Sequence, residues 1–254
     1  MKKKVFLVLF ISVLFGKISI AQNSETDELK TKTGILKIRP ILHGSLVLTH
    51  HNKTIYVDPY GGSQLYKNIK SPDIILITDI HGDHLDLKTL DSLDTSKAIL
   101  IAPKDVASKL PEKYTSKTII LNNNQGIHRL DFFIKAIAMY NLPEDNTSRH
   151  PKGRGNGYLL NIDDTQVYIS GDTEDIKEMR ILQNIDVAFV CMNLPYTMDI
   201  NQAASGVLEF KPSIVYPYHY RGTNGLSDVN EFKNLVNTKN KNIEVRLRNW
   251  YPSK

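Results

Sequence analysis

The 254-residue chain contains a single cysteine, Cys191, and therefore cannot form a disulfide within itself. Its fold must rest on a hydrophobic core or on bound metal. A chain of this length with 41% apolar residues can bury one substantial core, which favours a single domain. The sequence shows no repeat of fixed short period and no internal linker.

Long apolar runs are also scarce. The run from Val5 to Gly16 is shorter than the ~20 residues that span a bilayer, and Lys17 follows it directly. A start with three lysines, this short apolar run and small residues before Gln22 are typical of a secretory signal peptide cut after Ala21. A retained membrane anchor is the alternative. We expect a signal peptide over residues 1–21, a domain over 22–254 and a periplasmic location, with release from the cell left open.

The mature chain has little excess of positive charge, because most of the excess lies in the expected signal peptide. The net charge of +5 includes four lysines within residues 1–21 and no acid there, so the mature chain carries about +1 (5 − 4). So small a balance favours neither nucleic acid nor an anionic membrane as a partner. The expected partner is a small molecule.

One stretch combines a strand with metal-ligand chemistry. The uncharged run 74–77 is typical of a buried strand, and Asp79, His81, Asp83 and His84 follow it within a few residues. Carboxylate and imidazole are ligands that suit zinc and similar divalent ions. The alternative is a polar loop in which these side chains only cap and meet solvent.

The rest of the chain alternates between strand-like and helix-like segments. Patterning predicts strands at 35–38, 46–49, 54–57, 98–102, 118–121, 126–130, 132–140, 157–162, 166–170, 187–191, 213–216 and 243–247. Helices are expected at 103–110, at 173–182 with Asp172 or Thr173 as cap, at 200–210, and at 227–238 with Ser227 as cap. Residues 22–33 are predicted to be a flexible entry, and 141–156 a long loop. The order predicts an α/β fold, an αββα four-layer sandwich of two mixed β-sheets with helices outside.

Three further residues of ligand type stand at expected strand ends. Asp172 follows the strand 166–170, His219 follows 213–216, and His150 lies in the long loop. A lone histidine in such a place is usually an ordinary surface or core residue. Together with the cluster from Asp79 to His84, the three indicate a metal site.

These residues resemble the metallo-β-lactamase superfamily, whose signature is His-x-His-x-Asp-His followed by a distant His, an Asp and a final His. The resemblance covers the whole mature chain and is nearest to the branch of ascorbate-6-phosphate lactonase and the N-acylphosphatidylethanolamine phospholipase D. The motifs that carry the branch are Leu42-His43-Gly44-Ser45, Val57-Asp58-Pro59, His150-Pro151-Lys152-Gly153, Tyr168-Ile169-Ser170-Gly171-Asp172-Thr173, Pro195-Tyr196-Thr197-Met198 and Pro217-Tyr218-His219-Tyr220. In the first of these the family's Gly-His order is reversed, which leaves open whether His43 supports the site.

The resemblance implies a hydrolase with two divalent metal ions. The ions would be zinc, with manganese or iron as alternatives, and their shared hydroxide would attack an ester, a lactone or a phosphodiester. Asp83 would orient that hydroxide or accept its proton. The implied ligands are Asp79, His81 and His150 for the first ion and Asp83, His84 and His219 for the second, with Asp172 bridging both.

Asp79 departs from the family pattern, because it stands where the first His is usual. A carboxylate can bind zinc, but it is shorter than imidazole and carries a negative charge. The first site is therefore either altered but working or lost. The alternative function is a catalytically degenerate member of the fold that binds metal or acts as a scaffold.

Several residues beside the motifs could select the substrate. Arg149, Lys152 and Arg154 flank His150 and could clamp a phosphate or carboxylate, which would favour an anionic substrate; solvated loop charges are the alternative. Tyr196, Tyr218 and Tyr220 could line the pocket or simply pack. True β-lactamases of the superfamily have Cys where this chain has Asp172, which argues against antibiotic hydrolysis.

Overall fold

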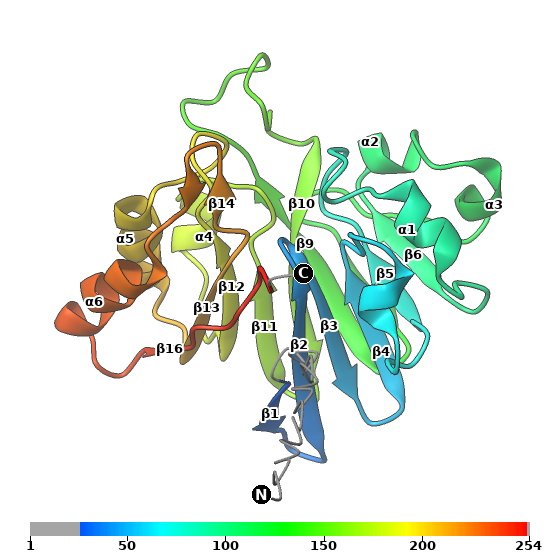
Figure 1. Cartoon of the computed structure of the whole chain (residues 1–254), viewed down its shortest axis with the longest axis horizontal. Helices are drawn as coiled ribbons and strands as arrows, with labels where there is room; N and C mark the ends of the chain where they lie inside the picture. Colours follow the sequence, from blue (N-terminus) through cyan, green and yellow to red (C-terminus); the bar gives the residue numbers. More distant parts are fainter. Residues whose placement is uncertain (1–25, 253–254) are drawn as a thin grey trace, which may run out of the picture.

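The computed structural model describes residues 26–252, so the expected signal peptide lies outside the described residues. Two seven-stranded sheets form the centre of the molecule (Figure 1). The first sheet consists of β1 (Asp27–Lys30), β2 (Ile35–Leu42), β3 (Ser45–His50), β4 (Lys53–Val57), β5 (Ile74–Leu76), β6 (Ile99–Ala102) and β7 (Thr118–Ile120), in that order. Pairing is antiparallel from β1 to β4 and parallel from β4 to β7.

The second sheet is also mixed. Its order is β16 (Glu244–Val245), β13 (Ile214–Tyr218), β12 (Val187–Cys191), β11 (Thr165–Ile169), β10 (Gly155–Ile162), β9 (Phe132–Met139) and β8 (Gly126–Arg129). Strands β8 to β11 pair antiparallel, while β11, β12, β13 and β16 pair parallel. A separate hairpin is formed by β14 (Arg221–Gly222) and β15 (Gly225–Leu226).

Helices cover the outer faces of both sheets (Figure 1). The first sheet carries η1 (Ser63–Tyr66), α1 (Leu87–Ser92), α2 (Lys104–Ala107) and α3 (Glu112–Thr115), and the second carries α4 (Lys177–Arg180), α5 (Ile200–Phe210) and α6 (Val229–Lys239). The predicted αββα sandwich of two mixed sheets is therefore confirmed. Among residues 26–252, no helix has the length and apolarity needed to cross a bilayer.

Period-two burial explains how the layers hold together. In β3, Leu46 and Leu48 enter the large core that joins the two sheets, while Val47 packs into a second core beneath the helices of the first sheet. Strands buried on both faces must be almost wholly apolar, which is why the short run of β5 carries no polar residue.

Local signals predicted some elements well and others poorly. Helix α5 spans the predicted residues 200–210, because Asp199 and Gln202 form a capping box that fixes its start. Helix α6 is capped by Asp228 and not by Ser227, whose hydroxyl donates to the carbonyl of Met192 instead. The interpretation of residues 22–33 as a flexible entry was wrong for 27–30, which form the edge strand β1 against β2.

The predicted helix over residues 173–182 was also wrong in length. Only α4, residues 177–180, is helical, and Ile176 stands at its N-cap. Asp172 caps nothing, because its carboxylate is buried among histidines, and the Thr173 hydroxyl accepts from the backbone N–H of Tyr140. Both side chains are therefore bound in tertiary contacts and do not cap a helix.

Candidate metal centre

The ligand-type residues follow the carboxyl ends of strands from both sheets. Residues 79–84 follow β5, Asp172 follows β11 and His219 follows β13. His150 lies in the segment between β9 and β10, which extends beyond the edge of the sheets (Figure 1). Carboxyl ends of parallel strands lie at one edge of a sheet, so side chains distant in sequence meet there.

One group, the Asp79 cluster, consists of Asp79, His81 and His150. The Oδ2 atom of Asp79 lies 2.7 Å from Nδ1 of His81 and 3.9 Å from Nε2 of His150. Asp79 and His150 are fully buried, and the three residues offer ligand atoms within 4.8 Å of one another. Such spacing is compatible with one shared divalent ion.

A second group, the His84 cluster, consists of His84, Asp172 and His219. Nε2 of His84 lies 3.2 Å from Nε2 of His219 and 3.3 Å from Oδ2 of Asp172. Asp83 lies beside this cluster, with Oδ2 3.3 Å from Nε2 of His219. Burial opposes ionisation of Asp83, but hydrogen bonds from His219 and His43 outweigh it and hold the pKa of Asp83 well below its usual value.

Asp172 joins the two clusters. Its Oδ2 atom lies 3.3 Å from Nε2 of His84 and 3.3 Å from Nε2 of His150, one histidine from each cluster. Burial alone would raise the pKa of this carboxyl, but the imidazoles of His219 and His84 hold it well below its usual value. A carboxylate in this position can bridge two cations.

Orphaned polar atoms show that the two clusters suit metal ions. Nε2 of His150 and Oδ1 of Asp172 are buried, and neither makes a hydrogen bond of normal geometry with another described residue. A buried polar atom left without a partner is costly in a folded protein. Divalent ions bound between the clusters would give both atoms the partner they lack, so the donor set fits two such ions.

Sequence reasoning missed the role of Asp58, which orients His84. Oδ2 of Asp58 lies 2.8 Å from Nδ1 of His84 and accepts a 2.6 Å hydrogen bond from the Thr78 hydroxyl, while Oδ1 accepts from the backbone N–H of Thr78 at 2.8 Å. With Nδ1–H donated to Asp58, the lone pair of Nε2 faces Asp172 and His219. Only the Val57-Asp58-Pro59 motif pointed to this residue.

His43 and Gly44 also support the site. Nε2 of His43 lies 3.1 Å from Oδ2 of Asp83, and its Nδ1 lies 2.7 Å from the hydroxyl of Tyr251. A Cβ atom at Gly44 would stand only 2.7 Å from Cδ2 of His219, so glycine leaves the room that this imidazole needs. His43, whose supporting role the sequence left open, thus contacts Asp83 and fixes its position.

The residues predicted to select a substrate lie in different surroundings. Arg149 is exposed and its guanidinium stacks 4.4 Å above the ring of Tyr196. Lys152 forms ion pairs with Glu144 and Glu178. The remaining three side chains bind partners within the protein. Arg154 binds Asp79, the Tyr218 hydroxyl accepts from the backbone N–H of Gly171, and the Tyr220 hydroxyl donates to the carbonyl of Arg248.

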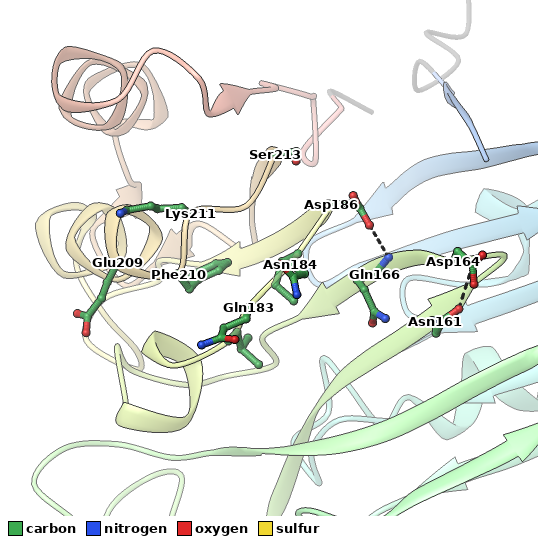
Figure 2. A pocket seen from close by; sticks show the side chains of 12 residues that line it. Asn161, Asp164, Gln166, Gln183, Asn184, Asp186, Glu209, Phe210, Lys211 and Ser213 are labelled. Carbon is green, nitrogen blue, oxygen red and sulfur yellow. Dashed lines mark hydrogen bonds between the residues drawn. The ribbon is translucent and has the colours of Figure 1, made fainter. Parts of the chain in front are cut away.

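Two hollows differ in their relation to the clusters. One of about 410 Å³ adjoins the His84 cluster and is lined by Leu42, His43, Tyr60, Arg221, Tyr251 and Pro252. Another of about 870 Å³ lies at the opposite end of the strands, where residues such as Asn161, Asp186 and Ser213 line it (Figure 2). The larger hollow contains no histidine or cysteine and no part of the clusters.

Comparison with known proteins agrees with this geometry. Residues 37–219, more than half of the chain, match the model of the beta-lactamase superfamily domain. The chain belongs to this superfamily. It is 31% identical over 217 residues to a UPF0173 metal-dependent hydrolase of Pyrococcus horikoshii, covering 81% of this chain and 94% of the relative. A similar hydrolase of Pyrococcus furiosus is 32% identical over 209 residues, with 77% and 90% covered.

Solved structures extend the relationship. The crystal structure of a Parabacteroides distasonis protein, described as a metal-dependent hydrolase, superposes with a TM-score of 0.79 at 40% identity and covers 89% of this chain and 98% of that one. The metallo hydrolase Igni18 of Ignicoccus hospitalis, at 22% identity and a TM-score of 0.71, covers 86% of this chain and 99% of that one and shares the fold. This superfamily member is therefore a metal-dependent hydrolase.

Proposed function

We propose that the protein hydrolyses an ester, a lactone or a phosphodiester of a small molecule with two divalent ions, zinc being favoured, bound at the Asp79 and His84 clusters. The observation that carries the proposal is the position of Asp172, whose carboxylate reaches one histidine of each cluster while its Oδ1 atom is orphaned. Two separate single-ion sites would not need a shared carboxylate.

The chain's own residues then have distinct tasks. His81, His150, His84 and His219 would supply neutral nitrogen ligands once a metal ion replaces their protons, and the Asp172 carboxylate lies within 3.3 Å of a histidine of each cluster. When bound, a pair of divalent ions activates water at neutral pH and polarises the oxygen of the bond under attack. The pKa of Asp83 is well below its usual value, so its carboxylate is ionised at neutral pH and would be able to accept a hydrogen bond from an attacking water and orient it.

The hollow beside the His84 cluster supports an anionic substrate. Arg221 lines this hollow, and its guanidinium stacks 4.4 Å above the ring of Tyr251. Among the described residues, neither Arg221 nor Arg149 forms an ion pair with a carboxylate, which leaves both guanidinium groups for an oxyanion. Leu42 and Tyr60 provide the apolar wall for the rest of the substrate.

The test is hydrolysis of chromogenic esters, lactones and phosphodiesters by protein loaded with zinc or manganese. We expect turnover of at least one class, loss of it with a chelator, and a fall of at least about 100-fold for Asp172→Ala. Asp164→Ala is the matched control, because Asp164 is exposed and, within residues 26–252, its carboxylate forms an ion pair only with Lys32. Equal activity of the two variants would overturn the proposal.

One alternative has a specific observation in its favour. Asp79 binds Arg154 through both carboxylate oxygens, which would suit a degenerate site that keeps the fold and has lost turnover. Such a protein would still bind metal ions but would hydrolyse nothing in a panel extended to amides.

We further propose that residues 1–21 direct export to the periplasm. The basic start, the short apolar run and the small residues before Gln22 support this. Mass spectrometry of the protein from fractionated cells would show a chain that begins at Gln22 in the periplasmic fraction; an intact N-terminus in the membrane fraction would indicate a retained anchor.

A further inference from the structure

The side chain of Arg154 forms a two-pronged ion pair with Asp79. Its Nε atom lies 3.1 Å from Oδ1 and its Nη2 atom 3.0 Å from Oδ2. Asp79 is fully buried and the Arg154 side chain is only 16% exposed. A bidentate pair of this kind fixes a carboxylate in orientation as well as in charge.

The ion pair involves the same oxygen that faces the imidazoles. Oδ2 of Asp79 is bound by Arg154 and also lies 2.7 Å from Nδ1 of His81. A carboxylate oxygen has two lone-pair positions, so it can serve the guanidinium and still face a metal ion. That ion would then share its ligand oxygen with a permanent positive charge.

The two clusters differ in this respect. The charges of Asp79 and Arg154 cancel, so the Asp79 cluster is about as neutral as a set of three histidines. In contrast, Asp172 and Asp83 pair only with histidines, and no lysine or arginine within residues 26–252 forms an ion pair with either. The His84 cluster therefore has the negative charge of Asp83 beside it, in addition to that of Asp172, which both clusters share.

We propose that Arg154 is a positioning residue that neutralises Asp79 and makes the two clusters unequal, so that the Asp79 cluster binds a divalent ion more weakly than the His84 cluster. In its absence Asp79 would be a buried carboxylate without a permanent counter-charge. The negative charge that Asp79 brings to the position of the family's first histidine is thus balanced by Arg154, 75 residues along the chain. The inference rests on the proposed metal site and is independent of the substrate.

The experiment is a zinc titration of the metal-free, full-length mature protein against a competing chelator, with bound zinc counted by mass spectrometry. Wild type should bind two ions with dissociation constants at least about tenfold apart. Arg154→Gln should lower the dissociation constant of the more weakly bound ion at least about tenfold and change that of the other ion less than about twofold. The reason is that a repelling charge has been removed from one cluster only. Arg154→Lys keeps that charge and should leave the weaker constant within about threefold of wild type.

Arg149→Gln is the matched control, because it removes the same charge from the same segment at a residue that stacks on Tyr196. The inference is overturned if Arg154→Gln leaves the dissociation constant of the more weakly bound ion unchanged or raises it. It is also overturned if Arg149→Gln lowers this constant as much as Arg154→Gln does. Two wild-type ions of equal affinity also refute the inference alone, whereas no bound zinc at all refutes the proposed function.

A replacement variant keeps the test decisive if Arg154→Gln does not fold. The double variant Asp79→His with Arg154→Gln leaves no unpaired buried charge and gives the cluster three imidazoles. Because this cluster is as neutral as that of wild type, it should bind the more weakly held ion within about threefold of the wild-type dissociation constant. A dissociation constant at least about tenfold higher would show that Arg154 does not neutralise Asp79 in wild type, and would overturn the proposal.

Discussion

The orientation of His84 by Asp58 makes a sharp prediction for Asp58→Asn. Among the described residues, every hydrogen-bond partner of the Asp58 carboxylate is a donor: the backbone N–H of Thr78 at Oδ1, and the Thr78 hydroxyl and His84 Nδ1 at Oδ2. Asparagine has nearly the same size but replaces one acceptor oxygen with an NH₂ donor. In either orientation of the amide, a donor now faces a donor.

The amide should turn its NH₂ group toward Thr78 Oγ1 and His84. The backbone N–H of Thr78 cannot change its role, whereas a hydroxyl can rotate and an imidazole can change tautomer. His84 would then accept at Nδ1 and carry its proton on Nε2, the atom that lies 3.3 Å from Asp172 and 3.2 Å from His219. A protonated Nε2 cannot bind a metal ion.

We expect Asp58→Asn to weaken zinc binding at the His84 cluster by about 10–100-fold, the usual cost of losing a partner that orients a ligand histidine. That range corresponds to about 1.4–2.7 kcal/mol. The measurement is equilibrium competition for zinc with a chromogenic chelator, accompanied by circular dichroism to verify the fold.

The matched control is Asp73→Asn. Asp73 accepts from the backbone N–H of Thr54 and pairs with Lys70 at the start of β5, the end of the strand away from the clusters. It should not change zinc affinity. If Asp58→Asn binds zinc as tightly as wild type in a folded protein, the argument about the tautomer of His84 is refuted.

Other predictions concern stability. In metal-free protein, the depressed pKa values of Asp83 and Asp172 mean that their stabilisation is present above about pH 4 and is lost as pH falls through the folded values. The pKa of His84 is raised by Asp172 and Asp58 despite burial, so its contribution is complete below about pH 6.5 and is lost as pH rises through the folded value. In the presence of a chelator, the midpoint temperature of thermal unfolding should therefore be highest between about pH 4 and pH 6.5. Bound zinc should abolish the fall in this temperature at alkaline pH. A midpoint temperature that does not change with pH would contradict this. Trp250→Ala should cost about 3–5 kcal/mol in denaturant unfolding, because the fully buried indole packs on Phe189 and Tyr218; a cost below about 1 kcal/mol would show that the chain end is not part of the core. Asp199→Ala should cost about 1 kcal/mol in the same assay through loss of the α5 cap, with Asn201→Ala as a nearby control that leaves the capping box intact.

Local signals determined much of this protein from the sequence alone. The start of α5 depends on two side chains three residues apart, and β12 on five consecutive apolar residues, so both were predicted with the right bounds. The strand of residues 74–77 followed by four ligand-type residues predicted where histidine and aspartate side chains would gather. Edge strand β1 was missed because its alternation is weak and its stability comes from pairing with β2.

The partners of the ligand residues were decided only by the tertiary structure. Asp58 meets His84 across 26 residues, and Arg154 meets Asp79 across 75. No local pattern encodes such pairs, because they arise when strand ends from two sheets are brought to one edge. For the same reason the sequence assigned Arg154 to a substrate and left Asp58 without a role, whereas the packed structure uses the charge of one to balance a carboxylate and the oxygens of the other to aim an imidazole.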